Sequence, residues 1–559
     1  MKKWKILSKL KEKSAKLKAE DIIKILLKNR GLKTKKEIAS FLNPDLSDIT
    51  IDSVGLNKKE VNKTIDKIKS AIEKKDQIVI YGDYDVDGIT ATAILWETLF
   101  FDLKAKVTPY IPNRIDEGYG LSVKGIDNLL IKFPETKLII TVDNGIVANE
   151  AVDYAFKKGI ETLITDHHVK SEVIPNAFSI VHTTSVCGAG IAYILAKEIM
   201  RQCLPTQESI DNHLELATLG TIADLVPLKD ANRVLVKFGL KKLSTTKRPG
   251  LLELYNESGI DKSNIGVYEV GHYIAPRLNA TGRMESAMDS LRLLCTKDVN
   301  RAHDLASLLG TVNRQRQNVM IEAVKHASLS VKQKSTLRKL LVVYHETYPE
   351  GVIGLVAGRL VEEFYRPAIV ISKGTRISKG SVRSIHGFNI IEFLRQSQEH
   401  FINIGGHPMA AGFTIETDKL DKMQKALENL SEEFDDDLFK RIIKIDLELP
   451  YSMISQRLYD EIQKLAPFGM SNMEPVFMSR NVKISEMRVI GKEKNHLKMT
   501  LTKDDINLDA ICFGMGGIYS DYTLGENIDI VFAIDENVWN DNRKLQLKIK
   551  DIKKSEAIA

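Results

Sequence analysis

Four short acidic segments, each placed at the end of an apolar run, constrain this chain more than any other feature. They are residues 81–88 (Tyr-Gly-Asp-Tyr-Asp-Val-Asp-Gly), 141–145 (Thr-Val-Asp-Asn-Gly), 165–168 (Thr-Asp-His-His) and 221–224 (Thr-Ile-Ala-Asp). The first three follow residues 78–80, 138–140 and 163–164, whose apolar, β-branched composition is typical of buried parallel strands. Ligands of an open α/β sheet bind at the carboxyl ends of such strands, so we expect these acidic and imidazole groups to converge on one crevice.

Carboxylates gathered in one crevice repel one another unless a cation lies among them. Asp85 and Asp87 would share a face of a strict strand, whereas in a glycine-flanked loop each could address its own ion. Asp143 could bridge two ions about 3.5–4 Å apart, an arrangement that holds both sides of an in-line displacement at phosphorus. His167 adds a nitrogen ligand, which favours Mn²⁺, Fe²⁺ or Zn²⁺ over a pure Mg²⁺ or Ca²⁺ site. A lone Asp-x-Asp is usually a solvated loop or a helix cap, so the metal prediction depends on all four segments together.

The triplet Asp166-His167-His168 and the order of the four segments resemble the DHH phosphoesterase superfamily. More selective motifs follow at residues 275–283 (Ala-Pro-Arg-Leu-Asn-Ala-Thr-Gly-Arg), 379–383 (Lys-Gly-Ser-Val-Arg), 405–412 (Gly-Gly-His-Pro-Met-Ala-Ala-Gly) and 466–475 (Ala-Pro-Phe-Gly-Met-Ser-Asn-Met-Glu-Pro). From about Ile80 to the C-terminus the chain resembles the RecJ family of single-strand-specific exonucleases. It departs from that family at Tyr348-Pro349, where Trp-His is usual, which leaves any role of that histidine open.

The resemblance implies a set of metal ligands and catalytic groups. Asp85 and Asp143 would hold one divalent ion, and Asp87, Asp143, His167 and Asp224 would hold the other, with Mn²⁺ expected and Mg²⁺ as the alternative. The implied catalytic residues are Asp85, Asp87, Asp143, His167, His168 and Asp224. His168 would either bind metal or face the scissile phosphate as a donor. Asp83 would be a ligand or an outer group, and Asp166 would accept from an imidazole N–H.

A loop with two arginines is a candidate for binding the DNA backbone. Arg277 and Arg283 bracket Asn279 in a segment that contains glycine, which we interpret as a loop. Guanidinium groups suit phosphate because each offers a planar fork of donors. A structural salt bridge is the alternative for these arginines.

A second phosphate contact is predicted further along the chain. Ser381 and Arg383 are two residues apart, so on a strand they would share a face. The resemblance makes them a pocket for a terminal phosphate, with Arg114 contributing. His407 lies among glycines, which favours a ligand-facing role over a buried structural histidine.

Length and composition limit the number of domains and the cellular compartment. A chain of 559 residues should form two to four domains, and its net charge of +6 neither shows nor excludes a basic surface. No apolar stretch approaches a membrane span. Four scattered cysteines without metal spacing predict a reduced, cytoplasmic protein: Cys187, Cys203, Cys295 and Cys512.

The pattern of elements predicts a multidomain α/β fold. We expect a basic, helical region at 1–57, whose first 20 residues form a solvated helix, with an arm that contacts DNA as the alternative. A doubly wound catalytic α/β domain is expected at 58–240. A helical connector is expected at 241–335 and a second α/β domain, DHHA1 by resemblance, at 336–435. Short strands at 440–559 predict a β-barrel, an OB-fold by resemblance. Its cues for nucleic acid are Lys483, Arg488, Lys492, Lys494, His496, Lys498, Phe477 and Phe513, with a solvated rim and core aromatics as the alternative.

The function implied is a metal-dependent 5′-to-3′ exonuclease that hydrolyses single-stranded DNA in repair and recombination. A DHH phosphodiesterase acting on oligoribonucleotides or cyclic dinucleotides is the alternative, although a small substrate requires neither a long connector nor a barrel. A scaffold without metals is disfavoured by the intact acidic segments. We expect a monomer that binds single-stranded DNA, with a single-stranded-DNA-binding protein and a helicase as candidate partners and no membrane.

Overall fold

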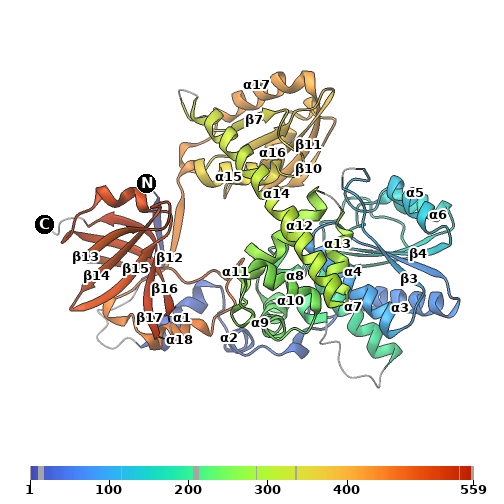
Figure 1. Cartoon of the computed structure of the whole chain (residues 1–559), viewed down its shortest axis with the longest axis horizontal. Coiled ribbons are helices and arrows are strands. Elements are labelled where there is room, and N and C mark those ends of the chain that lie inside the picture. The colour runs from blue at the N-terminus through green and yellow to red at the C-terminus, as the bar shows by residue number, and fades with distance from the viewer. Residues whose placement is uncertain are drawn as a thin grey trace. The chain divides into compact units, whose positions relative to one another are not determined.

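The computed structural model describes residues 2–9, 18–114, 116–204, 213–284, 286–333, 336–539 and 542–555. The chain forms two compact units, each built from separate stretches of sequence (Figure 1). One comprises Met1–Val54, Leu225–Leu240 and Ile442–Ala559, and the other comprises Gly55–Asp224 and Lys241–Arg441. Among the described residues, no helix is long and apolar enough to cross a membrane. The finer division into five domains stays a prediction.

A five-stranded parallel sheet confirms the doubly wound fold of the predicted catalytic region. Its strand order is β3-β2-β4-β5-β6, so the order of connection reverses between β2 and β4, where such sheets bind ligands. The strands are β2 (Gln77–Tyr81), β3 (Val107–Tyr110), β4 (Thr136–Val142), β5 (Glu161–Asp166) and β6 (Ser179–His182). The helices are α3 (Lys58–Glu73), α4 (Val86–Glu97), α5 (Val123–Lys132), α6 (Asn149–Lys157), α7 (Gly188–Cys203) and α8 (Leu214–Ala223). Val79, Ile139 and Ile164 are fully buried, as expected for strands covered on both faces.

The connector is helical, as predicted, and contains α10 (Pro249–Ser258), α11 (Val267–Glu269), α12 (Ala275–Met284), α13 (Met288–Cys295) and α14 (Val299–Lys332). Helix α14 packs against α10 and α12, and also against α15 and β7 of the second α/β region. The prediction of a loop around Arg277, Asn279 and Arg283 is wrong, because these residues lie in helix α12. The helical run is continuous from Val267, and a π-helical turn at Val270–Ile274 directly precedes Pro276, whose missing N–H interrupts the ordinary ladder of helical hydrogen bonds.

The second α/β region is built on a mixed sheet of order β10-β11-β9-β8-β7. Its strands are β7 (Leu341–His345), β8 (Ala368–Ser372), β9 (Ile377–Arg383), β10 (Asn403–His407) and β11 (Ala410–Glu416). Its helices are α15 (Ile353–Phe364), α16 (Ile390–Arg395) and α17 (Leu420–Ser431). Only β7 and β8 run parallel. Tyr348, at the departure from the family pattern, is buried in this core, and its hydroxyl lies 2.6 Å from Nδ1 of His326.

The C-terminal strands close a five-stranded barrel, which confirms the predicted β-barrel. The strands are β13 (Phe477–Ile490), β14 (His496–Lys503), β15 (Ile506–Cys512), β16 (Asn527–Trp539) and β17 (Asn542–Lys554). Strand β13 pairs with both β14 and β16, which closes the ring β13-β14-β15-β17-β16. Phe477 was expected near nucleic acid, but it is fully buried in the barrel core, where its ring centroid lies 6.1 Å from that of Phe532.

The prediction of a solvated helix for residues 1–20 is also wrong. Residues Lys3–Ser8 form strand β1, which pairs in parallel with β12 (Ile442–Glu448), and residues 10–17 lie outside the described part of the chain. Trp4 and Ile6 pack toward the apolar cluster of Met478 and Val531, while Lys3 and Lys5, which alternate with them, are exposed. This two-residue alternation is that of a half-buried strand.

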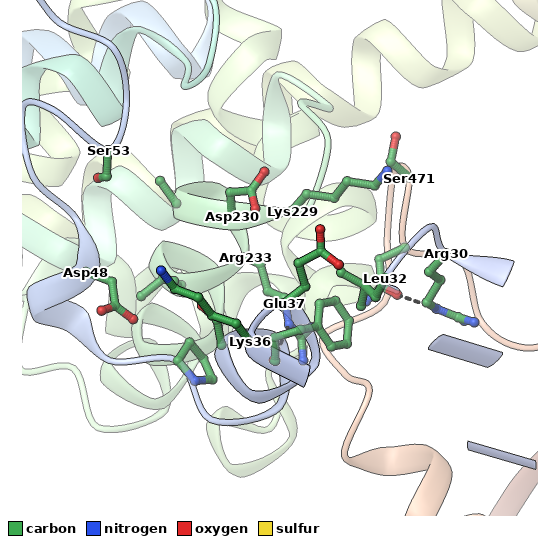
Figure 2. A pocket seen from close by; sticks show the side chains of 16 residues that line it. Arg30, Leu32, Lys36, Glu37, Asp48, Ser53, Lys229, Asp230, Arg233 and Ser471 are labelled. Carbon is green, nitrogen blue, oxygen red and sulfur yellow. Dashed lines mark hydrogen bonds between the residues drawn. The ribbon is translucent and has the colours of Figure 1, made fainter. Parts of the chain in front are cut away.

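Helices α1 (Ala19–Asn29), α2 (Lys35–Leu42), α9 (Asp230–Ser244) and α18 (Gln456–Gln463) complete the unit that contains the barrel. A cavity of about 450 Å³ lies between α2, α9 and the Ser471–Asn472 turn (Figure 2). Arg233, which lines this cavity, is 1% exposed and donates to the backbone carbonyls of Phe41, Leu465 and Ala466. Its guanidinium therefore ties the carboxyl ends of α2 and α18 together.

Candidate active site

Three aspartates enter the crevice from the segment that joins β2 to α4. Asp83 lies in the loop, Asp85 caps helix α4 and Asp87 lies in its first turn. The cap is local: Asp85 Oδ1 accepts from the N–H of Gly88 at 3.1 Å. The turn from strand to helix therefore places Asp85 with Asp83 and directs Asp87 to a different group of side chains, as the loop interpretation of this segment expects.

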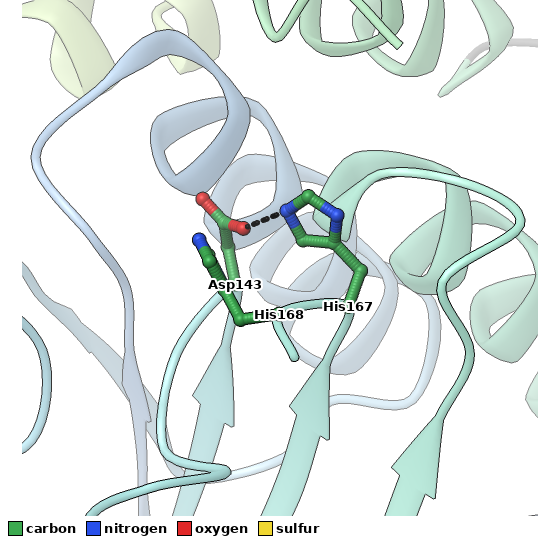
Figure 3. Close-up of side chains that lie close together, drawn as sticks. All are labelled: Asp143, His167 and His168. Carbon is green, nitrogen blue, oxygen red and sulfur yellow. Dashed lines mark ion pairs between the residues drawn. The ribbon is translucent and has the colours of Figure 1, made fainter. Parts of the chain in front are cut away.

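Further polar groups arrive from β4, β5 and α8. Asp143 follows β4 with a left-handed backbone (φ 63), His167 follows β5, and Asp224 ends α8. Nε2 of His167 lies 3.1 Å from Asp143 Oδ1, and 3.7 Å from both Asp87 Oδ2 and Asp224 Oδ2. Figure 3 shows His167 and its neighbour His168 beside the Asp143 carboxylate. Segments distant in sequence thus meet at one point.

The side chains form three overlapping groups, each with its ligand atoms within 4.8 Å of one another. The groups are Asp83, Asp85 and Asp143; Asp87, His167 and Asp224; and Asp143, His167 and His168. Asp143 belongs to two of them, which is the position that a bridging carboxylate requires. In the described part of the chain, Oδ1 of Asp83 and Oδ1 of Asp143 are buried without a hydrogen-bond partner. Buried carboxylate oxygens without donors, next to an imidazole, fit divalent cations.

The carboxylates gathered here repel one another, and their pKa values show it. Burial, followed by the charges of neighbouring carboxylates, raises the pKa of Asp83 and that of Asp143 well above their usual range. The same causes raise the pKa of Asp224 to about 8. Burial lowers the pKa of His167, which keeps its imidazole neutral and able to bind a metal. A bound cation would reverse the proton preference of these carboxyl groups.

Helix α7 begins directly at the cluster. The backbone N–H groups of Gly188 and Ala189 donate to Asp87 at 2.6 and 2.8 Å, so the start of the helix fixes this carboxylate. A Cβ added at Gly188 would lie 2.5 Å from Cβ of Asp143. Glycine at this position therefore allows the helix to approach both aspartates.

His168 is held from both ring nitrogens. Its Nδ1 lies 2.7 Å from Asp166 Oδ1, and its Nε2 lies 3.0 Å from the hydroxyl of Tyr119. Asp166 also accepts from the backbone N–H of Ile146 at 2.8 Å. Burial disfavours the charged imidazole, but the hydrogen bond and charge of Asp166 outweigh it and raise the pKa of His168 to about 9. Tyr119 was missed from the sequence, where the only signal is its place between two glycines.

A group of arginines lies next to the carboxylates. Burial, and then the charges of Arg114 and Arg316, lower the pKa of Arg283 to about 10. Burial and Arg114 likewise lower the pKa of Arg383, whose guanidinium lies 3.1 Å from Oγ of Ser381. Among the described residues, Nε of Arg283 and Nε of Arg316 have no hydrogen-bond partner. Several crowded guanidinium groups with unused donors suit a phosphate. Sequence reasoning missed Arg316, which nothing distinguishes from other polar residues of α14.

Other predicted contacts lie outside this arrangement or serve it indirectly. Arg277 forms an ion pair with Glu257, and Glu257 also pairs with Arg314 at 2.6 Å. Arg277 therefore forms a structural salt bridge, which was the alternative to a DNA contact. Asn279 Oδ1 accepts from the N–H of Val86 at 3.1 Å and so supports the acidic loop. His407 is exposed on β10.

Family models match three parts of the chain: the DHH family N-terminal domain at residues 77–221, the DHHA1 domain at 337–433 and the RecJ OB domain at 445–551. The chain is 36% identical to the single-stranded-DNA-specific exonuclease RecJ of Bacillus subtilis, over 98% of the chain and 70% of that protein. It is 30% identical to the protein of the same name from Dickeya dadantii, over 88% of the chain and 90% of that protein.

Solved structures agree with this relationship. RecJ from Thermus thermophilus in complex with Mn²⁺ matches with a TM-score of 0.83 and 27% identity, over 99% of this chain and 80% of that one. The same protein in complex with Mg²⁺ matches with a TM-score of 0.77 and 26% identity, over 99% and 79%. The sequence identity, the matched domains and the shared fold together show that this chain belongs to the RecJ family.

Proposed function

We propose that this chain is a metal-dependent exonuclease that removes nucleotides from the 5′ end of single-stranded DNA, in DNA repair and recombination. The observation that carries the proposal is the pairing of two clusters, one of carboxylates with His167 and one of arginines with unused donors. The first suits divalent ions and the second suits the DNA backbone. The alternative substrates, oligoribonucleotides or cyclic dinucleotides, find no support among the relatives, which are named for single-stranded DNA.

Two divalent ions fit the residues of the crevice. Asp83, Asp85 and Asp143 would hold one, and Asp87, Asp143, His167 and Asp224 would hold the other. When bound, such ions polarise the scissile phosphate and make an attacking water more acidic. Mn²⁺ is the expected ion and Mg²⁺ the alternative, because His167 supplies nitrogen among oxygen ligands and both ions occur in solved relatives.

His168 acts from the other side of the crevice. Its imidazole is kept charged by Asp166 and oriented by Tyr119, so its positive charge would stabilise the negative charge on a phosphate near the carboxylates. This role differs from metal ligation, because both ring nitrogens already have partners in the protein.

The arginine cluster gives the reaction its direction. Arg383 and Ser381 would hold a 5′-terminal phosphate, with Arg114, Arg283 and Arg316 adding charge. A fixed separation between this pocket and the metal cluster places the first phosphodiester bond at the catalytic groups. An enzyme arranged in this way releases nucleotides one at a time from the 5′ end.

The barrel supplies further DNA contacts. Phe513 is 58% exposed at the end of β15, and its ring lies edge-to-face with His496 at 5.4 Å. Lys492 and Lys494 lie in the turn between β13 and β14, beside His496 at the start of β14. An exposed aromatic ring with lysines nearby suits a single strand. We further propose a cytoplasmic monomer that meets DNA with a single-stranded-DNA-binding protein and a helicase.

The test is nucleolysis of one 60-nucleotide strand labelled at either end, with and without Mn²⁺. The proposal expects mononucleotides from the 5′ end only, no product in EDTA, and slow cleavage of a matching duplex. A linear dinucleotide and a cyclic dinucleotide serve as comparison substrates. Preferential cleavage of either dinucleotide, or release from the 3′ end, would overturn it.

A further inference from the structure

We infer that the groove between helix α3 and the start of strand β6 is a second nucleotide-binding site, separate from the catalytic crevice. Two adjoining hollows of about 600 and 250 Å³ form it, and both are lined by Lys63 and Phe178. Together they are in the size range of sites for small ligands. The inference does not depend on the proposed function, because it concerns no residue of the catalytic crevice.

The larger hollow is basic. Lys59, Lys63 and Lys67 follow one another at four-residue intervals on α3, so they lie in one row along the helix. Lys67 forms an ion pair with Glu161. In the described part of the chain, neither Lys59 nor Lys63 forms an ion pair. Asp66 lines the same hollow, so the two remaining lysines leave it with a net positive charge, which suits a phosphate.

The smaller hollow has apolar walls and a buried hydroxyl. Val152, Phe156 and Ile160 line it from α6 and from the turn that follows. Phe156 is 71% exposed, so a large aromatic surface is open to a ligand. Thr162, near the start of β5, is 3% exposed, and its Oγ1 has no hydrogen-bond partner among the described residues. A buried hydroxyl of this kind is costly unless a bound molecule supplies the missing partner.

These features match the parts of a nucleotide. A planar heterocycle would lie against Phe156 and Phe178, since contact between a base and an aromatic ring is favourable for every base. The hydroxyl of Thr162 and the exposed amide of Asn176 would bond with the polar edge of that heterocycle. The phosphates would reach the row of lysines on α3. A fatty acid would leave the hydroxyl unpaired, and an inorganic phosphate would leave the apolar walls uncovered.

The site lies at the opposite end of the sheet from the carboxylates. Thr162 is near the start of β5, whereas His167 directly follows the end of this strand. The steps from residue 162 to residue 167 correspond to about 17 Å at about 3.3 Å per residue. A nucleotide bound in the groove therefore lies outside the catalytic crevice, and the two sites can be occupied at the same time.

The test is equilibrium dialysis of the full chain against radiolabelled dAMP, ATP and pyrophosphate in EDTA, which withholds metal from the catalytic crevice. We expect one nucleotide bound per chain. Lys63→Ala should weaken binding roughly ten- to a hundredfold, because it removes a charged contact with phosphate. Thr162→Val keeps the shape of the side chain and should weaken binding roughly two- to tenfold. Lys157→Ala is the matched control, because Lys157 is an exposed lysine of α6.

Arg383→Ala distinguishes this site from the catalytic crevice. A nucleotide held in the proposed pocket for a terminal phosphate would be lost in Arg383→Ala and kept in Lys63→Ala. That pattern would overturn the inference, as would no nucleotide binding in wild type or pyrophosphate bound as tightly as ATP. Tighter binding of dAMP than of ATP would identify the occupant as the mononucleotide that a nuclease releases, and the reverse order would identify free triphosphates.

Failure of the proposed function can be told apart from failure of this inference. Binding in EDTA requires no cleavage, so the dialysis gives the same answer for a chain that hydrolyses nothing. Conversely, Lys63→Ala should cleave single strands at the wild-type rate in the absence of added nucleotide. A lower rate in that variant would place Lys63 on the path of the DNA and would overturn a separate site.

Discussion

The backbone N–H of Gly188 donates to Oδ2 of Asp87 at 2.6 Å, and this bond brings the start of α7 against the acidic cluster. Because a Cβ at Gly188 would lie 2.5 Å from Cβ of Asp143, Gly188→Ala must displace the helix or the carboxylate. A displacement of about 1 Å is worth roughly a hundredfold in rate. We therefore expect a folded variant with about a hundredfold lower kcat and weaker Mn²⁺ binding, measured by calorimetry. Gly358→Ala is the control, since a Cβ there meets nothing within 4 Å; equal losses in both variants would contradict the argument.

Asp143→Asn should abolish cleavage while leaving binding of a single strand nearly unchanged. Asp143 is shared by two potential ligand groups, so its loss disturbs both ions, whereas the arginine cluster still contacts phosphate. Single-turnover rates and anisotropy titrations measure the two properties. Asp153→Asn, on the exposed side of α6, is the matched control. A rate above a trace in the folded Asp143 variant would show that the two-ion assignment is wrong.

Metal binding should stabilise the protein more at high pH than at low pH. A carboxyl group whose pKa is raised by folding, such as Asp224 at about 8, destabilises the metal-free fold progressively as pH rises from about 4 to about 8. A divalent ion removes this penalty, so the rise in melting temperature on adding Mg²⁺ should be larger at pH 8.5 than at pH 6. Differential scanning fluorimetry against EDTA measures it. Asp224→Asn should narrow the difference between the two pH values, and an equal rise at both in wild type would count against the metal site.

Arg383→Ala should weaken discrimination in favour of a 5′-phosphorylated end. A hydrogen bond to a charged group is worth about 1.5–3 kcal/mol, or about ten- to a hundredfold in affinity. The measurement is the ratio of kcat/KM for 5′-phosphate and 5′-hydroxyl strands. Ser381→Ala should lower the ratio less, because the hydroxyl contributes no charge. Arg359→Ala, an exposed arginine of α15 paired with Glu362, should leave it unchanged. An unaltered ratio in Arg383→Ala would place the terminal phosphate elsewhere.

The contribution of the barrel to DNA binding is better tested by point substitutions than by truncation. Strand β12 pairs with β1, so removal of residues 440–559 would expose the core packed around α1. We expect Phe513→Ala with Lys494→Ala to weaken binding of a long strand and leave cleavage of a trinucleotide intact. Each lost phosphate contact lowers the slope of log affinity against log salt by about 0.7. Lys5→Ala is the control, because Lys5 is an exposed residue of β1. Equal slopes in all proteins would show that this end of the barrel does not contact DNA.

The parallel sheet and the convergence of acidic segments could be predicted because local sequence determines both. Apolar runs such as 138–140 form strands wherever both faces are covered, and parallel strands then align the residues that follow them. Asp143 and His167 meet for this reason, and no knowledge of side-chain packing was needed.

What could not be predicted depends on partners distant in sequence. Lysines suggested a solvated helix for the N-terminus, although the alternation of Trp4 and Ile6 is that of a strand whose partner lies beyond residue 440. Glycine suggested a loop around Arg277, where Gly282 instead lets α12 approach the backbone of Tyr84. Tyr119 and Arg316 carry no local signal, because only the folded crevice shows what they face.

The pairing of β1 with β12 has a consequence for the order of synthesis. Lys3 is the first of these residues to leave the ribosome, yet its register partner is Ile442. At about 5–20 residues per second, β1 waits roughly 20 to 90 seconds for the strand it needs. The entire catalytic unit is translated during that interval, so it can fold while the N-terminal strand remains an unsatisfied edge. A nascent chain that stalls before residue 442 would therefore carry a completed catalytic unit and an exposed β-edge, the kind of surface that chaperones bind.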